Sequence, residues 1–133
     1  TVANLNIDMI GRKIELFETD SLVMVYLIRA DRLSLGLDSV IKTTNNTYTN
    51  LMLDEKYNAL KEPLNLYYRS DHYNFAKNGI PSCFFFGGFH DDYHKPTDTI
   101  EKISFEKIAQ ITRLVFHATW KIADAPNRLS LIE

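Results

Sequence analysis

The sequence predicts an α/β fold in which a mixed, partly parallel β-sheet is flanked by helices. Two observations lead to this prediction. Three short apolar runs, at residues 2–11, 21–29 and 82–88, have the length and the β-branched or aromatic content of buried strands. Segments with helical spacing alternate with these runs along the chain, and such alternation is typical of layered α/β domains.

Size and composition limit the classes of protein to consider. The 133 residues are enough for one core, so we expect a single domain over residues 1–133. With 45% apolar residues, 24% charged residues and a formal charge of -2, the chain lacks the basic clustering of nucleic-acid binders. No apolar run approaches the roughly 18–20 residues of a membrane-spanning helix. The single cysteine, Cys83, excludes an internal disulfide and predicts a small buried hydrophobe.

The first half of the chain predicts two strands and a helix. The run VANLNIDMIG predicts a strand that is closed by Gly11 and carries Asp8 near its carboxyl end. The run SLVMVYLIR, residues 21–29, predicts a second buried strand. Residues 34–46 have apolar positions at helical spacing and end in two asparagines, which predicts a helix.

The middle of the chain is less regular. Residues 47–68 show no clear period, although LNLYY at 64–68 could form a short strand. Ser70 is placed to cap a short helix over residues 71–78, which the following glycine and proline would end.

The last third predicts a strand, a loop and a long helix. SCFFFGG, residues 82–88, predicts a buried strand, and residues 89–99, FHDDYHKPTDT, form the loop that leaves it. Ser104 is placed to cap a helix that ends before Pro126. The positions at helical spacing expected to face the core are 105, 108, 111, 112, 115, 119 and 122.

Two metal-competent side chains follow predicted strands. Ligands of open α/β sheets bind beyond the carboxyl ends of the strands, where Asp8 and His94 lie. Carboxylate oxygen and imidazole nitrogen are ligands of catalytic zinc, but an isolated pair of this kind is more often a turn cap and a polar loop residue. His90 and His94 would share one face of a helix, yet the neighbouring glycines and proline indicate a loop. His72 and His117 lie on predicted helices and are expected to be packed or solvated.

Three motifs in order carry a resemblance to a known family. The resemblance is carried by NIDMIGR, then YRSDHYNFAKNGIP, then an apolar strand followed by DYHKPTDT and a long amphipathic helix. With these motifs in this order, the chain resembles the C-terminal half of the di-zinc aminopeptidases of metallopeptidase family 28. The resemblance covers roughly residues 4–123. It implies half of a three-layer α/β/α domain of the di-zinc exopeptidase fold, with two zinc ions at the carboxyl ends of the strands and a peptide substrate.

The resemblance also implies roles for particular residues. Asp8 corresponds to a ligand of one zinc and His94 to a ligand of the other. Tyr93 matches a tyrosine that, in some members, donates a hydrogen bond to the oxyanion formed during hydrolysis, which would stabilise the transition state. In such a site two zinc ions share a water whose pKa they lower, and a glutamate acts as general base.

Three further residues match parts of the motifs that surround the ligands. Arg69 and Asp71, in RSDH, lie where the family lines the substrate cleft or supports the ligands. Asp98 fits a residue that orients a ligand imidazole or the loop itself.

Part of the family pattern is missing from this chain. In the family a histidine, a bridging aspartate, a glutamate ligand and the general-base glutamate all precede the strand that holds Asp8, and only seven residues precede Asp8 here. The acidic pair Asp54-Glu55 lies on the other side of that strand. We therefore expect the C-terminal portion of a catalytic domain, inactive by itself and with zinc absent or weakly bound. An unpaired strand edge left by the missing half would favour self-association.

Two alternatives change the function and keep the fold. Glutaminyl cyclases resemble this family but use one zinc and tend to have tryptophan before the final ligand, whereas Tyr93 stands here. A non-enzymatic relative acting as a binding module is less consistent with the presence of both Asp8 and His94. Because bacterial members of the family are commonly exported, the resemblance favours an exported protein.

Overall fold

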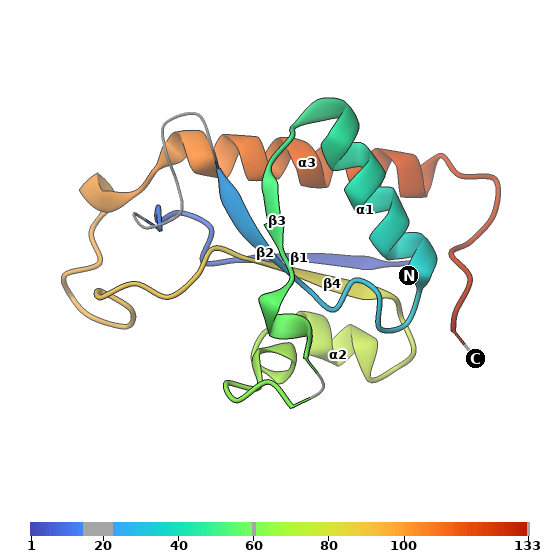
Figure 1. Cartoon of the computed structure of the whole chain (residues 1–133), viewed down its shortest axis with the longest axis horizontal. Coiled ribbons are helices and arrows are strands. Elements are labelled where there is room, and N and C mark those ends of the chain that lie inside the picture. The colour runs from blue at the N-terminus through green and yellow to red at the C-terminus, as the bar shows by residue number, and fades with distance from the viewer. Residues whose placement is uncertain (15–22, 60, 133) are drawn as a thin grey trace.

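The computed structural model describes residues 1–14, 23–59 and 61–132. Its four strands form one sheet in the order β1-β4-β2-β3 (Figure 1). The strands are β1 (Asn4–Asp8), β2 (Met24–Ile28), β3 (Met52–Asp54) and β4 (Ser82–Phe86). β1 pairs with β4 and β2 with β3 in parallel, whereas β2 and β4 are antiparallel. The predicted mixed, partly parallel sheet is therefore confirmed.

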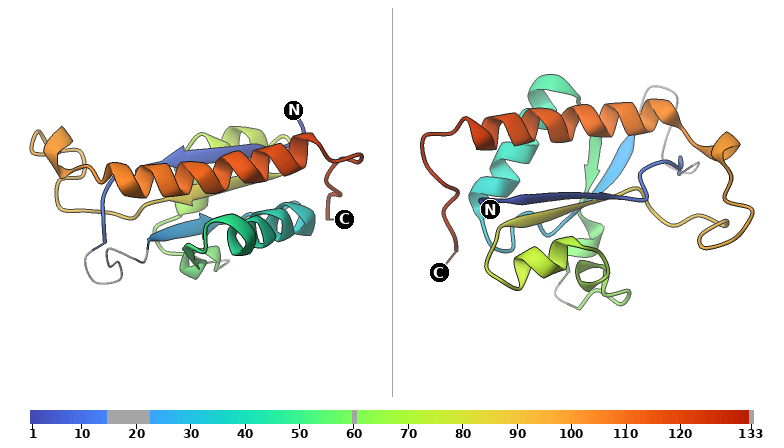
Figure 2. Two further views of the ribbon diagram at one scale, coloured as in Figure 1. Left: turned by 90° about the horizontal axis from the view of Figure 1, so that it is seen from above. Right: turned by 180° about the vertical axis from the view of Figure 1, so that it is seen from behind.

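Helices cover both faces of the sheet. On one face lie α1 (Leu35–Tyr48) and α3 (Phe105–Ala123), and on the other lies the short helix α2 (His72–Ala76), as Figures 1 and 2 show. The described residues also include three single 3-10 turns: η1 (Lys56–Asn58), η2 (Leu66–Tyr68) and η3 (Ile100–Lys102). Within the described residues, no helix has both the length and the apolar composition needed to span a bilayer.

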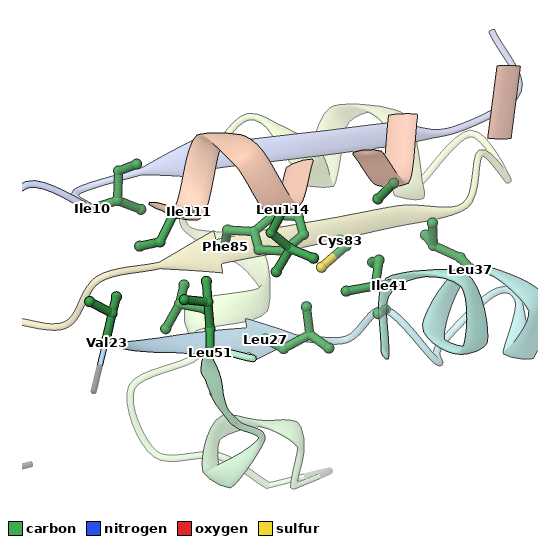
Figure 3. Close-up of a cluster of buried hydrophobic side chains, with 13 residues drawn as sticks. Ile10, Val23, Leu27, Leu37, Ile41, Leu51, Cys83, Phe85, Ile111 and Leu114 are labelled. Atoms are coloured by element: carbon green, nitrogen blue, oxygen red, sulfur yellow. The ribbon is translucent and has the colours of Figure 1, made fainter. Parts of the chain in front are cut away.

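Every residue of β2 and β4 is buried, because both faces of these central strands are covered. Alternate residues enter two different clusters, as the two-residue period of a strand requires. On the α1/α3 face, Phe85 and Cys83 pack with residues of both helices (Figure 3). On the α2 face, Phe84 and Phe86 pack with side chains of β2. Cys83 is fully buried, as its apolar context predicts.

Two serines cap the long helices. The hydroxyl oxygen of Ser104 accepts a hydrogen bond from the backbone N–H of Lys107, and that of Ser34 accepts one from Leu37. The predicted cap at Ser104 is confirmed. α1 continues beyond the two asparagines expected to end it, because the buried side chain of Asn45 binds the backbone N–H and carbonyl of Leu51 instead of interrupting the helix.

Two local expectations in the middle of the chain are wrong. Residues 64–68 do not form a strand: Asn65 has a left-handed backbone (φ 52°), and the Glu62 carboxylate accepts hydrogen bonds from two backbone N–H groups, so the segment turns into η2. Ser70 does not cap α2, since its hydroxyl group contacts Asp8 and the cap position is taken by Asp71.

Other boundaries differ from those expected by a few residues. The strand expected over 2–11 is regular only over β1, and of the strand expected over 21–29 the first two residues lie outside the described residues. β3 was not predicted, because its three residues are too few to show a period.

The core-facing stripe of α3 also differs from the expected one. The buried positions are Lys107, Ile111, Leu114 and Ala118, whereas positions 112 and 119 are exposed. Phe105, Phe116 and Trp120 form a second apolar stripe, 58–64% exposed, on the opposite side of the helix. The helical spacing correctly predicted the helix. Because the helix carries two apolar stripes, the spacing did not show which of them faces the core.

The buried imidazole of His72 predicts a dependence of stability on pH. It stacks on Phe84, with ring centroids 4.9 Å apart, and burial lowers the pKa of His72 to about 4, although the Tyr67 backbone and the carboxylates of Asp71 and Asp8 act in the opposite direction. An unfolded histidine titrates near 6.5, so the unfolded chain binds the proton first as the pH falls. The free energy of unfolding should therefore fall by about 1 kcal/mol per pH unit between pH 6.5 and 4.

Urea unfolding at several pH values measures this slope. His72→Phe should flatten it, whereas Asn74→Gln, an exposed change in the same helix that alters no titratable group, should leave it unchanged. An equal slope in the wild type and His72→Phe would contradict the assignment.

Candidate active site

The parallel pairing of β1 with β4 brings the carboxyl ends of both strands to one edge of the sheet. Asp8 is in register with Phe86, and Gly87 follows at once. A Cβ atom at Gly87 would lie 2.1 Å from the carbonyl oxygen of Met9, so only glycine allows the two backbones to approach this closely. Met9 itself has a left-handed backbone (φ 57°). The loop after β4 is thereby held beside Asp8.

A pocket of about 710 Å³ opens at this edge. Isoleucine side chains form much of its apolar wall. Five of the six residues singled out from the sequence line it: Asp8, Arg69, Tyr93, His94 and Asp98. The sixth, Asp71, stands at the cap position of α2 and is not part of the lining. The structure thus brings together side chains that are separated by up to 90 positions in the sequence.

The Asp8 carboxylate is oriented by a short chain of hydrogen bonds. The hydroxyl group of Ser70 donates to Oδ2 of Asp8 at 2.8 Å, and the Ser70 oxygen accepts from the side-chain amide of Asn6, also at 2.8 Å. Sequence reasoning missed this function of Ser70. The available signal was its position within RSDH, between two residues already assigned to the site.

Tyr93 and His94 stack on each other beside the pocket. Their ring centroids are 3.9 Å apart with an interplanar angle of 22°. Phe89 packs edge-on against Tyr93, and the guanidinium group of Arg69 lies over the Phe89 ring at 5.5 Å. His94 has a left-handed backbone (φ 56°), an uncommon conformation for a residue other than glycine, and such conformations cluster at functional sites.

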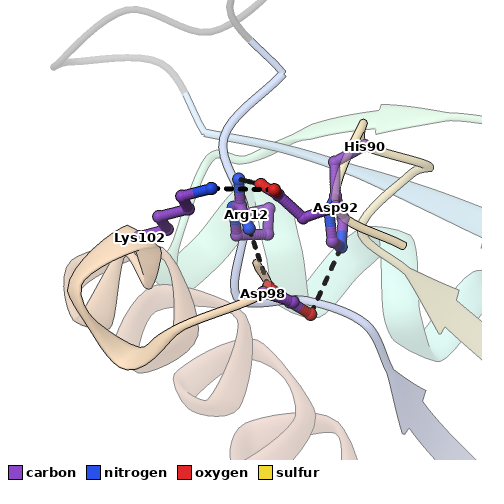
Figure 4. A network of polar contacts seen from close by, with 5 residues as sticks. All are labelled: Arg12, His90, Asp92, Asp98 and Lys102. Carbon is purple, nitrogen blue, oxygen red and sulfur yellow. Dashed lines mark hydrogen bonds and ion pairs between the residues drawn. The ribbon is translucent and has the colours of Figure 1, made fainter. Parts of the chain in front are cut away.

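An ion-pair network connects the loop to the chain that follows β1 (Figure 4). Arg12 contacts Asp92 and Asp98 at 2.7 Å each, and Lys102 contacts the second oxygen of Asp92 at 2.7 Å. Lys102, Thr97 and Arg12 hold the pKa of Asp92 well below its usual range. The carboxylate of Asp98 contacts Arg12 and, at 3.9 Å, Nε2 of His90.

The donor atoms at this edge suit zinc in kind but not in number. Asp8 offers carboxylate oxygen and His94 imidazole nitrogen, and a catalytic zinc takes three protein ligands. Within residues 1–14, 23–59 and 61–132, no three His, Cys, Asp or Glu side chains gather closely enough to hold a metal ion. A complete zinc site would therefore need ligands beyond those that the described residues supply.

Comparisons with known proteins agree on the kind of domain. Residues 1–119 match the family model described as Peptidase family M28. No curated protein matches the chain. Among solved structures, the aminopeptidase from Aneurinibacillus sp. strain AM-1 is similar with a TM-score of 0.66 and 21% identity, over 100% of this chain and 28% of that one.

Two further aminopeptidase structures are similar. LapA of Legionella pneumophila has a TM-score of 0.72 and 15% identity, over 96% of this chain and 32% of that one. BSAP, a zinc aminopeptidase from Bacillus subtilis, has a TM-score of 0.64 and 26% identity, over 90% of this chain and 27% of that one. The chain therefore spans between 27% and 32% of the length of these solved relatives.

Proposed function

Because the chain belongs to peptidase family M28, we propose that it is the C-terminal portion of the catalytic domain of a zinc aminopeptidase, which hydrolyses N-terminal peptide bonds. One observation carries the proposal beyond family membership: Asp8 and His94, at the carboxyl ends of the parallel strands β1 and β4, line one pocket. The similarity to aminopeptidase structures supports it.

In this proposal Asp8 binds one zinc and His94 the other. Ser70 orients the Asp8 carboxylate, as its hydrogen bond indicates. Zinc held there would supply a water of lowered pKa and a Lewis acid for the carbonyl of the peptide bond. The remaining ligands and the general-base glutamate would come from the part of the domain that this chain does not contain.

Tyr93 and Arg69 are the hydrogen-bond donors of the pocket in this proposal. The Tyr93 phenol would donate to the carbonyl oxygen of the substrate as negative charge develops on it. Arg69, held over Phe89, would face the substrate from the same side of the pocket. The presence of Tyr93 where glutaminyl cyclases tend to have tryptophan supports a peptidase over a cyclase.

The complete peptidase provides the test of this proposal. Tyr93→Phe should lower kcat by about 100-fold and change KM little, because the lost hydrogen bond forms in the transition state. His94→Ala and Asp8→Ala should each reduce bound zinc from two ions to one, measured by atomic absorption after dialysis. An unchanged kcat in Tyr93→Phe would remove Tyr93 from the mechanism, and two retained zinc ions in both ligand variants would contradict the ligand assignment.

The isolated chain should bind zinc weakly. One carboxylate or one imidazole per metal cannot compete with water at micromolar zinc, since catalytic sites use three protein ligands. Calorimetry on the isolated chain, at a concentration where sedimentation shows the fraction of monomer, should give a Kd for zinc no tighter than about 100 µM. Tight binding at a one-to-one ratio would show that the ligand count is wrong, and His90, Asp91 or Asp92 would then be the first additional ligands to replace.

We also propose that the rest of the domain packs against the edge of β1 and the exposed stripe of α3. β1 lies at an edge of the sheet formed by the described strands, and Phe116 and Trp120, in that stripe, are 58% and 64% exposed. Exposed aromatic groups and an unpaired strand edge each favour contact with another chain. Without that covering part, the chain would associate with itself through this surface.

Sedimentation velocity measures this association. The isolated chain should form dimers or larger species at micromolar concentration, and the double variant Phe116→Glu, Trp120→Glu should be monomeric because the surface becomes charged. Lys77→Glu changes an exposed residue at the end of α2, on the other face of the sheet, and should not alter the association. A wild-type chain that remains monomeric up to about 1 mM, where only the weakest contacts form, would refute self-association.

A further inference from the structure

The position of Tyr93 and His94 relative to Asp8 depends on a loop of eleven residues. Asp8 ends β1, whereas Tyr93 and His94 lie in residues 89–99, a loop that leaves β4 and belongs to no regular element apart from turns. A surface loop of this kind samples several conformations unless specific contacts hold it. Two of the ion pairs that hold it come from one residue, Arg12, which is only four positions beyond Asp8.

Arg12 binds the loop on both sides of His94. One guanidinium nitrogen contacts Asp92, two residues before His94, and the other contacts Asp98, four residues after it, each at 2.7 Å. The side chains of Arg12 and Asp92 are only 20% and 13% exposed. Isolated pairs on a protein surface contribute little to stability, but this one is partly shielded and extended by Lys102, which contacts the other oxygen of Asp92. Two attachment points around His94 restrain the segment between them.

The backbone of Arg12 is itself attached to α3. The ammonium group of Lys107, a fully buried residue, donates to the carbonyl oxygen of Arg12 at 2.9 Å. The backbone N–H of Ser104 donates to the carbonyl oxygen of Gly11 at 2.8 Å. The guanidinium group therefore extends from a backbone segment that is itself anchored to α3. Through Arg12 the loop is connected to the chain that directly follows β1.

We propose that Arg12 is a positioning residue that fixes the loop carrying Tyr93 and His94 relative to Asp8. That the position of the loop matters for zinc binding rests on the function proposed above. The restraint of the loop by Arg12 does not depend on that function. Arginine suits this role because its planar guanidinium group presents two separate nitrogens to the two carboxylates, at a fixed spacing that the single ammonium nitrogen of lysine does not provide.

Amide hydrogen exchange on the zinc-free chain of 133 residues tests the restraint directly. Three turn hydrogen bonds report on the loop: Tyr93 N–H to His90, Lys95 N–H to Asp92 and Asp98 N–H to Lys95. Arg12→Met should accelerate exchange at these amides by about tenfold, since local opening no longer breaks two ion pairs. Amides of β4 and of the middle of α3 should keep their rates. Arg128→Met, which removes an exposed arginine beyond the end of α3, is the matched control and should change none of them.

Two further variants separate positioning from general destabilisation. Arg12→Lys should recover part of the protection, and Asp98→Asn should accelerate exchange less when Arg12 is already Met than in the wild type, because both changes remove the same contact. If Arg12→Met does not fold, Arg12→Lys and Asp98→Asn alone should still accelerate the loop amides and leave those of β4 unchanged.

The proposal is overturned if the loop amides keep their rates in these variants, or if the β4 amides accelerate equally. The hydrogen-exchange measurement needs no zinc, so it tests the restraint by Arg12 independently of the proposed function. The proposed function is tested separately by the zinc content of the complete peptidase.

Discussion

β1 and β4 lie side by side in parallel, and the candidate site depends on this pairing more than on any other contact. Parallel strands end at the same edge of a sheet, so Asp8 and the loop that follows Phe86 are necessarily neighbours. The absence of a side chain at Gly87 lets the backbone after β4 pass directly against Met9. A shift of one residue in this register would turn the Asp8 carboxylate toward the other face of the sheet. The pairing of β1 with β4 therefore forms the pocket, and polar contacts only orient the side chains within it.

The centre of the sheet is well buried, whereas the backbone at the pocket is strained. β2 and β4 are covered on both faces, and aromatic side chains of β4 fill both clusters. By contrast, Met9 and His94, next to or within the pocket, have left-handed backbones that cost energy in residues with side chains. Such conformations persist where surrounding structure imposes them, and here the close approach at Gly87 and the ion pairs of Arg12 provide that structure.

The two stripes of α3 relate this chain to a larger domain. One stripe, which includes Ile111 and Leu114, packs on the sheet, and the other exposes Phe105, Phe116 and Trp120 to solvent. A helix with apolar residues over much of its surface is typical of the interior of a larger domain. This chain covers only 27% to 32% of the solved aminopeptidases to which it is similar, which agrees with that interpretation.

The sequence by itself determined the elements and motifs whose signals are local. Continuous apolar runs identified three of the four strands, Ser104 marked the start of α3, and the order of three short motifs indicated the family, which the match over residues 1–119 confirms. These features could be predicted because the period of a strand or helix and the residue that caps a helix involve only residues close together in the sequence.

Only the tertiary structure decided the contacts between distant segments. It set the strand order, made a strand of Met52–Asp54, selected the buried stripe of α3, turned Ser70 away from α2 toward Asp8, and joined Arg12 to carboxylates 80 and 86 positions away. A polar side chain such as Ser70 has several acceptors within local reach, and the choice among them depends on which strand ends lie nearby. That choice follows from the pairing of β1 with β4, which no local pattern in the sequence encodes.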